Sequence, residues 1–347
     1  MNNFLYCFDS NYNIQGYCSI FSLLENAEEK VNIYIIHKEP DSFKLFQDNL
    51  KKHINLNSLS LYKFADYEYD FPNLTNRHLT EATYYRLFIS NYLPEGIDLI
   101  MYVDADAFFI NKFMKKLDRT KSQFKQSDFT IGALTTNNNI NIKEKDYEKL
   151  NLTSRKYFNA GVLLINYQKW LKNNYYEKLL KILNDRKISF NAWDQDILNS
   201  FLDGDYFELD EIFNININFI EDEVDLDSSN IENNGIIIHY IGSPKPWNTK
   251  GLAYPGQKYF YMIFRKLFSS FYFLQINNRK NSIATLYKIF VNKKYSFIEK
   301  KFKLFIEFFI GFLLKTNKNN LLKTRKIEKF KLVLFAKQLW ALQDLNL

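Results

Sequence analysis

The chain has 347 residues, of which 46% are hydrophobic and 24% charged, so it can bury a sizeable core as one large domain or two smaller ones. Its net charge of +7 is uneven, because residues 258–347 contain 19 Lys and Arg against four Asp and Glu. With two cysteines, no visible signal peptide and no run of about 20 uncharged apolar residues, the sequence excludes a disulfide scaffold and predicts no membrane-spanning helix.

Residues 1–64 alternate between strand and helix patterns. Strands are predicted at 3–8, 31–37 and 59–64, and helices at 12–26 and 40–53. This alternation is typical of a parallel sheet with right-handed crossovers. Because Cys7 lies in the first strand and Cys18 in the first helix, we expect free buried thiols in a reducing cytosol.

The turn after the first strand lacks the Gly-x-Gly-x-x-Gly pattern of a dinucleotide site. It contains Asp9, Asn11 and Tyr12 instead, and these polar groups suit a nucleoside better than a pyrophosphate. A helix is predicted at 81–91, with Thr80 as its N-cap. Arg86 lies on this helix, and it is either a surface or capping cation or a fixed positive charge beneath an active site.

The apolar strand predicted at 99–103 runs directly into Asp104-Ala105-Asp106. Such a run indicates a buried strand whose polar end emerges at an edge of the sheet. Ligands of open α/β sheets bind beyond the carboxyl ends of the strands, so Asp104 and Asp106 stand where a metal ion and a phosphorylated ligand are expected. Alone the signal is weak, since most Asp-x-Asp pairs are loop or cap residues.

The middle of the chain continues these patterns, with strands predicted at 129–134 and 157–166, a helix at 167–184 and an edge strand or loop at 213–219. Asn159-Ala160-Gly161 suggests a close approach of the backbone to a ligand or a neighbouring group. A further helix follows Asp194, a natural N-cap that places Gln195 and Asp196 in the first turn. Simple helix capping is the alternative explanation of both acids.

A last buried strand is predicted from residue 236, and it reaches His239 before a Gly/Pro turn at 242–247. A lone histidine at a strand end is usually structural. Here Gly242, which allows close backbone approach, and Lys245, which can pair with a phosphate, follow it closely.

Beyond residue 257, aromatic side chains recur among Lys and Arg. The apolar stretch at 296–315 is too short and too charged to span a bilayer, but it suits a helix lying in the membrane interface. Nucleic-acid binding is disfavoured because the aliphatic and Phe content is too high. Packing as helices on the preceding domain is the remaining alternative.

In their order, these motifs resemble glycosyltransferase family eight, the retaining GT-A enzymes that include bacterial lipooligosaccharide galactosyltransferases and glycogenin. The resemblance covers about residues 1–250 and rests on six motifs, at 9–12, 83–87, 102–106, 158–162, 194–196 and 239–247. It implies a UDP-sugar donor, a Mn²⁺ ion and a uridine held by Asp9, Asn11 and Tyr12. It also implies a sugar pocket lined by Arg86, Asn159, Asp194 and Gln195.

The chemistry of such a transfer agrees with these residues. A departing nucleoside diphosphate concentrates negative charge, which a divalent ion held by Asp104, Asp106 and His239 neutralises as a Lewis acid. An imidazole among carboxylates favours Mn²⁺, with Mg²⁺ as the alternative ion. Lys245 supplies a second charge for the phosphates, and Gly242 lets backbone N–H groups approach them.

The expected retaining mechanism is a same-face displacement. In the family that the chain resembles, no clear second carboxylate stands where a glycosidase-like nucleophile would be needed, and the amide of Gln195 is a poor nucleophile. We therefore expect the leaving phosphate to take the acceptor proton while Gln195 stabilises the oxocarbenium-like transition state. The loop at 135–156 is the expected acceptor or lid loop.

The predicted architecture is an α/β GT-A fold, with a Rossmann-like, mostly parallel sheet and flanking helices at 1–257 and a basic, aromatic-rich helical region at 258–347. The predicted function is retaining transfer of galactose or glucose from a UDP-sugar to an oligosaccharide, lipid-linked glycan or glycoprotein, forming an α linkage in lipopolysaccharide or cell-surface polysaccharide synthesis. The alternative is a catalytically inactive carbohydrate-binding or regulatory protein on the same fold. We expect a cytoplasmic protein, peripheral at the anionic inner face of the cytoplasmic membrane, with no nucleic-acid partner.

Overall fold

The computed structural model describes residues 1–65, 71, 81–136, 144–184, 193–218, 228–242, 245–254, 256–268, 270–274, 279–291 and 298–304. The chain divides into two compact units, Met1–Lys245 with Gly256–Leu267 and Pro246–Pro255 with Phe268–Leu347. The functional boundary after residue 257 stays a prediction, and α9 (Gln257–Leu267) belongs to the first unit. Among the described residues, no helix is long and apolar enough to cross a membrane.

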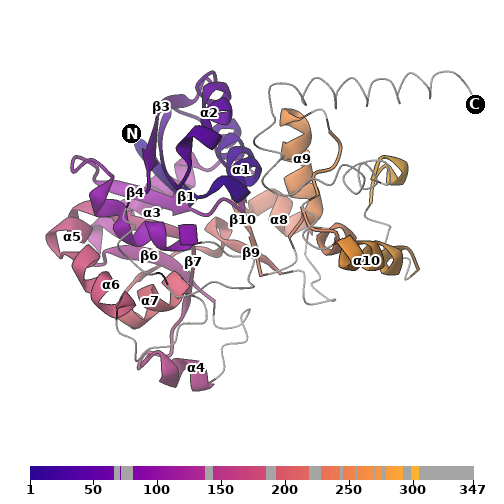
Figure 1. Ribbon diagram of the computed structural model, residues 1–347. Coiled ribbons are helices and arrows are strands. Elements are labelled where there is room, and N and C mark those ends of the chain that lie inside the picture. The colour runs from indigo at the N-terminus through magenta and orange to yellow at the C-terminus, as the bar shows by residue number, and fades with distance from the viewer. Residues whose placement is uncertain are drawn as a thin grey trace, which may run out of the picture. The chain divides into compact units, whose positions relative to one another are not determined.

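A seven-stranded sheet with the order β3-β2-β1-β4-β7-β6-β8 lies within the first unit (Figure 1). Its strands are β1 (Asn2–Phe8), β2 (Val31–His37), β3 (Leu56–Lys63), β4 (Leu99–Val103), β6 (Ile131–Thr135), β7 (Phe158–Asn166) and β8 (Phe207–Glu208). β7 runs antiparallel to β4 and β6, whereas the other paired strands of this sheet are parallel. The predicted mostly parallel α/β sheet is therefore confirmed.

α-Helices and 3₁₀ helices pack around this sheet, and in Figure 1 α5, α6 and α7 lie grouped together. The helices of the first unit before β10, in the described residues, are η1 (Ser10–Tyr12), α1 (Asn13–Asn26), η2 (Pro40–Ser42), α2 (Lys44–Leu50), η3 (Glu81–Asn91), α3 (Met114–Gln126), α4 (Glu144–Lys149), α5 (Tyr167–Lys172), α6 (Tyr175–Leu183), α7 (Trp193–Leu202), η4 (Glu211–Phe213) and α8 (Ser228–Asn234).

The side chains of β1 alternate between the two faces of the sheet. The Tyr6 hydroxyl accepts a hydrogen bond from Ser19 of α1 at 3.3 Å. Leu5 and Cys7 belong instead to the core cluster that includes buried residues of η3, α5, α6 and α7.

Some predicted helices differ in detail from the structure. Residues 81–91 form a 3₁₀ helix, whose three residues per turn align Thr83 and Arg86 on one side. The helix predicted at 167–184 is two helices, because Asn174 between α5 and α6 has a left-handed φ of 52°. α7 begins one residue before Asp194, whose side chain pairs with Arg86 rather than serving as the predicted N-cap. Thr80 lies outside the described residues.

A three-stranded sheet, β5-β10-β9, brings a distant part of the chain to the end of β4. β5 (Ala107–Phe109) follows directly on Asp106, and β10 (Ile237–Ile241) pairs with it antiparallel so that His239 lies opposite Ala107. β9 (Ile215–Asn218) is the parallel partner of β10 and lies at the edge of this sheet, as predicted. The register of this small sheet therefore places His239 beside Asp106.

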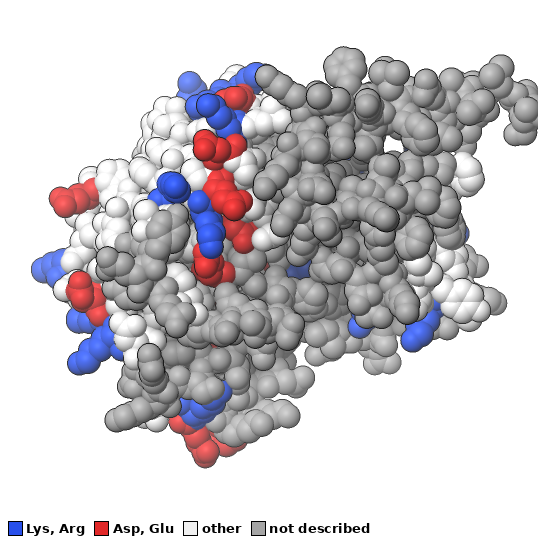
Figure 2. Space-filling model, in the orientation of Figure 1, with Lys and Arg blue, Asp and Glu red and all other residues white. Residues whose placement is uncertain are grey.

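Charged side chains of both signs are intermixed on the face shown in Figure 2. In the described part of the chain, ion pairs such as Lys125–Asp98 and Arg155–Glu144, each at 2.5 Å, join residues of opposite charge. This mixture differs from the continuous basic stripe that follows a nucleic-acid backbone. The absence of a nucleic-acid partner stays a prediction.

The second unit contains η5 (Lys250–Ala253) and α10 (Arg279–Val291). α10 exposes Ile283, Tyr287 and Val291, which follow one another at four-residue intervals and so lie on one side of the helix. Of the interfacial stretch predicted at 296–315, residues 298–304 are described and the others lie outside the described residues.

Candidate active site

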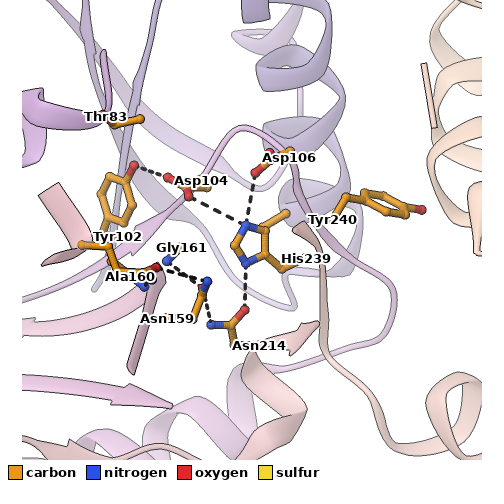
Figure 3. Close-up of polar contacts among 12 residues, drawn as sticks. Thr83, Tyr102, Asp104, Asp106, Asn159, Ala160, Gly161, Asn214, His239 and Tyr240 are labelled. Atoms are coloured by element: carbon orange, nitrogen blue, oxygen red, sulfur yellow. Dashed lines mark hydrogen bonds and ion pairs between the residues drawn. The ribbon is translucent and has the colours of Figure 1, made fainter. Parts of the chain in front are cut away.

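Three candidate metal ligands converge beyond the end of β4 (Figure 3). One ligand atom from each of Asp104, Asp106 and His239 lies within 4.8 Å of the other two. His239 Nε2 lies 3.3 Å from an oxygen of Asp106 and 3.8 Å from an oxygen of Asp104. The carboxylates come from the connection between β4 and β5 and the imidazole from β10, so the strand pairing assembles the site.

This donor set fits a divalent first-row ion. Two carboxylates and one imidazole provide two hard oxygen donors and one nitrogen donor, a combination that suits Mn²⁺. The His239 side chain is 5% exposed, whereas those of Asp104 and Asp106 are 25% and 13% exposed. Both carboxylates are therefore partly accessible, so substrate oxygen atoms could reach an ion that they hold.

Lys245 forms an ion pair with Asp106 of this cluster. Its Nζ donates to Asp106 Oδ2 at 2.7 Å and also to the carbonyl oxygen of Tyr240. Burial would raise the pKa of Asp106, but the ion pair with Lys245, to which the cationic form of His239 adds, holds this pKa below its ordinary value. Gly242 follows β10 with a φ of 69°, a conformation that favours glycine. Their phosphate-binding roles stay predictions.

Arg86 is buried between two carboxylates. Its Nη2 donates to Asp104 Oδ1 at 2.9 Å, and its Nε lies 2.9 Å from Asp194 Oδ2. Its Nη1 donates to the carbonyl oxygen of Ala160, and its guanidinium carbon lies 4.1 Å from the centre of the Tyr102 ring. Burial raises the pKa of Asp194 to about 7, and Arg86 opposes this rise. The buried position excludes the alternative that Arg86 is a surface cation.

The amide of Gln195 is held at both ends. Its Oε1 accepts from the backbone N–H of Ala160 at 2.9 Å and from Asn159 Nδ2 at 3.3 Å. Its Nε2 donates to the Tyr157 hydroxyl at 2.9 Å, and that hydroxyl donates to Asp196 at 2.6 Å. These contacts show that the carbonyl end of the Gln195 amide faces β7 and that its NH₂ end faces the Tyr157 hydroxyl.

The turn predicted to hold a nucleoside adjoins the metal ligands. Asp9 accepts from the backbone N–H of Asn11 at 2.9 Å and from its Nδ2 at 3.1 Å, so the carboxylate caps η1. Burial raises the pKa of the Tyr12 hydroxyl, and the charges of Asp106, Asp9 and Asp104 add to this rise. β1 runs parallel to β4 with Leu5 opposite Tyr102, so the turn that follows β1 lies at the same edge of the sheet as Asp104 and Asp106.

Three residues of this site carried no predicted role. The Tyr102 hydroxyl donates to Asp104 Oδ1, and Tyr157 orients Gln195. Asn214 lies between Asn159 and His239, with its Nδ2 3.0 Å from Asn159 Oδ1 and its Oδ1 3.1 Å from His239 Nδ1. Tyr102 is the first residue of the motif at 102–106, and Tyr157 directly precedes the motif at 158–162, which is a signal that could have found them. The Asn/Ile alternation around residue 214 gave no such signal.

Comparisons with known proteins agree with this arrangement. The profile of Glycosyl transferase family 8 matches residues 3–251. A putative glycosyltransferase of Haemophilus influenzae is 29% identical over 262 residues, which cover 72% of this chain and 73% of that protein. A lipopolysaccharide 1,3-galactosyltransferase of Salmonella typhimurium is 30% identical over 191 residues, which cover 54% of this chain and 55% of that protein. A lipopolysaccharide 1,2-glucosyltransferase of Escherichia coli is 27% identical over 251 residues, covering 69% and 71%.

Solved structures share the fold. The galactosyltransferase LgtC, in complex with donor and acceptor sugar analogues, superposes with a TM-score of 0.61 at 20% identity and covers 76% of this chain and 95% of its own. The glycosyltransferase GlyE of Streptococcus pneumoniae superposes with a TM-score of 0.54 at 20% identity, covering 78% of this chain and 64% of its own. These likenesses establish the GT-A fold. Since the family profile extends from β1 to the residues beyond β10, the chain belongs to glycosyl transferase family 8.

Proposed function

We propose that this glycosyltransferase moves galactose or glucose from a UDP-sugar to an oligosaccharide, lipid-linked glycan or glycoprotein, with Mn²⁺ and with formation of an α linkage. The convergence of Asp104, Asp106 and His239 carries this proposal. The amide of Gln195, which the backbone N–H of Ala160 in β7 orients, also supports it. Relatives named as lipopolysaccharide galactosyl- and glucosyltransferases support a hexose donor and a cell-surface glycan acceptor.

Asp104, Asp106 and His239 would hold Mn²⁺, with Mg²⁺ as the alternative ion. Once bound, the ion supplies Lewis-acid charge that stabilises the leaving diphosphate. Lys245 lies 2.7 Å from Asp106, so its ammonium group brings a second positive charge to the place where the phosphates meet the metal ligands. Gly242, next to the end of β10, keeps the adjoining backbone free of a side chain.

Two groups of residues would bind the rest of the donor. Asp9, Asn11 and Tyr12 would hold the uridine on η1, beside the metal ligands. Asn159 and Gln195 would line the sugar pocket, together with the pair formed by Arg86 and Asp194. Arg86 already donates to Asp104 and to the carbonyl oxygens of Thr83 and Ala160. We therefore assign it the role of holding the two carboxylates in place.

The geometry of Gln195 supports same-face displacement. Its Oε1 accepts two hydrogen bonds, from Ala160 and Asn159, so both lone pairs of this oxygen are engaged. An amide oxygen held in this way is a poor nucleophile, but its dipole is fixed beside the reacting sugar. In the proposed step the bond from the sugar to the diphosphate breaks, the acceptor hydroxyl attacks the same face, and its proton goes to the departing phosphate. A glycosyl adduct on Gln195 or Asp196, found by mass spectrometry of the intact protein, would overturn this mechanism.

The test of the proposed function is release of UDP from UDP-galactose and UDP-glucose. We expect the wild type to release UDP with Mn²⁺ and to stop when EDTA removes the ion, and we expect Asp106→Asn to be inactive in either case. A wild type that binds Mn²⁺ and UDP but releases none from any UDP-hexose, with any glycan acceptor, would favour the alternative of a carbohydrate-binding or regulatory protein. The intact ligand set argues against that alternative.

We further propose that the basic region 258–347 attaches the protein to the anionic inner face of the cytoplasmic membrane. Residues 258–347 are strongly basic, and α10 exposes 44% of Ile283, 69% of Tyr287 and 58% of Val291 on one side. The Ile283→Ser/Tyr287→Ser variant should lose binding to phosphatidylglycerol vesicles. Ile54→Ser, which removes a 79% exposed side chain of the first unit, should retain it. Equal binding by both variants would favour simple packing of the region.

A further inference from the structure

We infer that Asn214 is a positioning residue that fixes the tautomer of His239 and links the metal ligands to Gln195 through Asn159. The contacts are independent of the reaction, and only the consequence for transfer rests on the proposed function. Asn214 is 0% exposed and lies directly before β9. Figure 3 shows its amide between the imidazole of His239 and the amide of Asn159.

A backbone N–H group fixes the direction of this chain of contacts. The N–H of Gly161 donates to Asn159 Oδ1 at 2.9 Å, and a backbone N–H can only donate. The oxygen end of Asn159 therefore faces Asn214, so Asn214 must present its NH₂ group there. Its own Oδ1 then faces His239 Nδ1, and this nitrogen must carry a proton to make the contact.

The consequence for the metal site is direct. With the proton on Nδ1, the imidazole of His239 keeps the lone pair of Nε2 for the side where Asp104 and Asp106 lie. Nε2 is thus prepared as a metal ligand. Mutation of a hydrogen-bond partner of this kind typically lowers metal affinity or activity about 10- to 100-fold.

The same series of hydrogen bonds reaches Gln195 in the other direction. Asn159 uses its Nδ2 to donate to Gln195 Oε1, which the backbone N–H of Ala160 independently identifies as the oxygen. Donors therefore point one way from His239 to Asn214, to Asn159 and to Gln195, and aligned hydrogen bonds strengthen one another. Removal of Asn214 should accordingly disturb both the metal ligand and the amide at the sugar.

Two variants separate the ends of this chain. Asn214→Leu removes both contacts, and we expect a loss of Mn²⁺ affinity of about 10-fold or more. Asn214→Asp keeps an acceptor for His239 Nδ1 but places a carboxylate oxygen against Asn159 Oδ1, so we expect Mn²⁺ affinity to remain and kcat for UDP release to fall about 10-fold. A purely structural residue would not divide affinity from turnover in this way.

Mn²⁺ affinity is measured on the full chain with UDP present, from the electron paramagnetic resonance signal of the free ion. Asn55→Leu is the matched control, because Asn55 Nδ2 donates to the carbonyl oxygens of Leu24 and Ala27 at 3.0 and 2.7 Å, near the amino ends of β2 and β3. Wild-type affinity in Asn214→Leu would overturn the inference. A wild type that binds no divalent ion would also overturn it, since Nε2 would then have no ion to ligate.

The tautomer is read directly by ¹⁵N NMR of the metal-free protein at alkaline pH. The chain has four histidines, and loss of one signal in His239→Gln assigns the ring. We expect a proton on Nδ1 in the wild type and a mixture of tautomers in Asn214→Leu. A proton on Nε2 in the wild type contradicts the inference. If the wild type binds Mn²⁺ but releases no UDP, the proposed function fails while the affinities and the tautomer still decide the role of Asn214.

Discussion

The imidazole of His239 lies against the backbone of Gly161, so closely that a Cβ at position 161 would be 2.0 Å from Cε1 and 2.6 Å from Nδ1. Real Cβ atoms do not approach other atoms to this distance, so the observed position of the His239 ring requires glycine at position 161. Asn214 contacts Nδ1 of the same ring, which restricts any movement away from β7. The close approach predicted at Asn159-Ala160-Gly161 is therefore an approach to a candidate metal ligand.

Gly161→Ala should displace the His239 ring and abolish most Mn²⁺-dependent UDP release. A displacement of about 1 Å in a catalytic constellation can cost about 100-fold in rate, and we expect a loss of at least that order. Gly96→Ala is the matched control, because a Cβ there meets nothing within 4 Å. The measurement is UDP release at saturating donor, together with Mn²⁺ affinity. Near-wild-type values for Gly161→Ala would show that His239 is not required where the structure places it.

Asp106→Asn should abolish Mn²⁺-dependent turnover with the fold intact, and it should also leave Lys245 without its carboxylate. Lys245 is 6% exposed and donates to Asp106 at 2.7 Å. Removing one partner of a buried pair costs about 3–5 kcal/mol, and the residual exposure of Asp106 makes the lower end the better expectation.

The double variant Asp106→Asn/Lys245→Met should recover much of the lost free energy of unfolding without recovering Mn²⁺ binding. Guanidinium unfolding with EDTA present separates the two effects. Equal stability of Asp106→Asn and the double variant would mean that the unpaired Lys245 cation is not the cause of the loss.

The sequence reveals the parts of this site that are encoded locally. Asp104 and Asp106 are recognisable because the apolar run of β4 ends directly at the two carboxylates. His239 and Lys245 are recognisable because a similar run ends beside them. The role of Asn214 depends instead on the pairing of β9 with β10, which no periodicity encodes.

The same distinction applies to the fold. The parallel strands and the crossover helices of the first sixty-odd residues follow from local alternation, and the structure contains them. The antiparallel direction of β7 follows from contacts with β4 and β6, which are distant in sequence. The 3₁₀ conformation of residues 81–91 is likewise not encoded in the apolar pattern, since the buried residues follow one another without a break from Tyr84 to Ile89 and so show neither helical period.

Arg86→Met should lower the free energy of unfolding by about 3–5 kcal/mol, because it leaves Asp104 and Asp194 without the buried cation between them. Denaturant unfolding measures this change, with Arg119→Met on the exposed face of α3 as the control. Adding Asp194→Asn to Arg86→Met should restore part of the stability at alkaline pH, where the Asp194 carboxyl is ionised and one uncompensated charge is removed. A loss no greater than that of Arg119→Met would contradict the structural role of Arg86.

His37 should make the protein less stable as the pH falls below about 6.5. It is 0% exposed; its Nδ1 accepts from the backbone N–H of Glu39 at 2.8 Å, and its Nε2 lies 2.9 Å from Asn13 Oδ1. Burial lowers the pKa of His37 to about 3, and the backbone of Asp9 opposes this shift only in part. The folded state therefore keeps this imidazole neutral at pH values where the unfolded chain binds a proton.

The sign of the effect follows from proton binding. Between about pH 6.5 and 3 the unfolded state binds more protons, so this residue makes the free energy of unfolding fall by up to about 1.4 kcal/mol for each pH unit of acidification. His37→Gln removes the contribution, and its unfolding free energy should decline less between pH 7 and pH 5, by about 2 kcal/mol relative to the wild type. Urea unfolding at the two pH values measures this difference directly. Because both proteins share every other titrating group, parallel pH profiles could mean only that His37 titrates equally in the folded and unfolded chains.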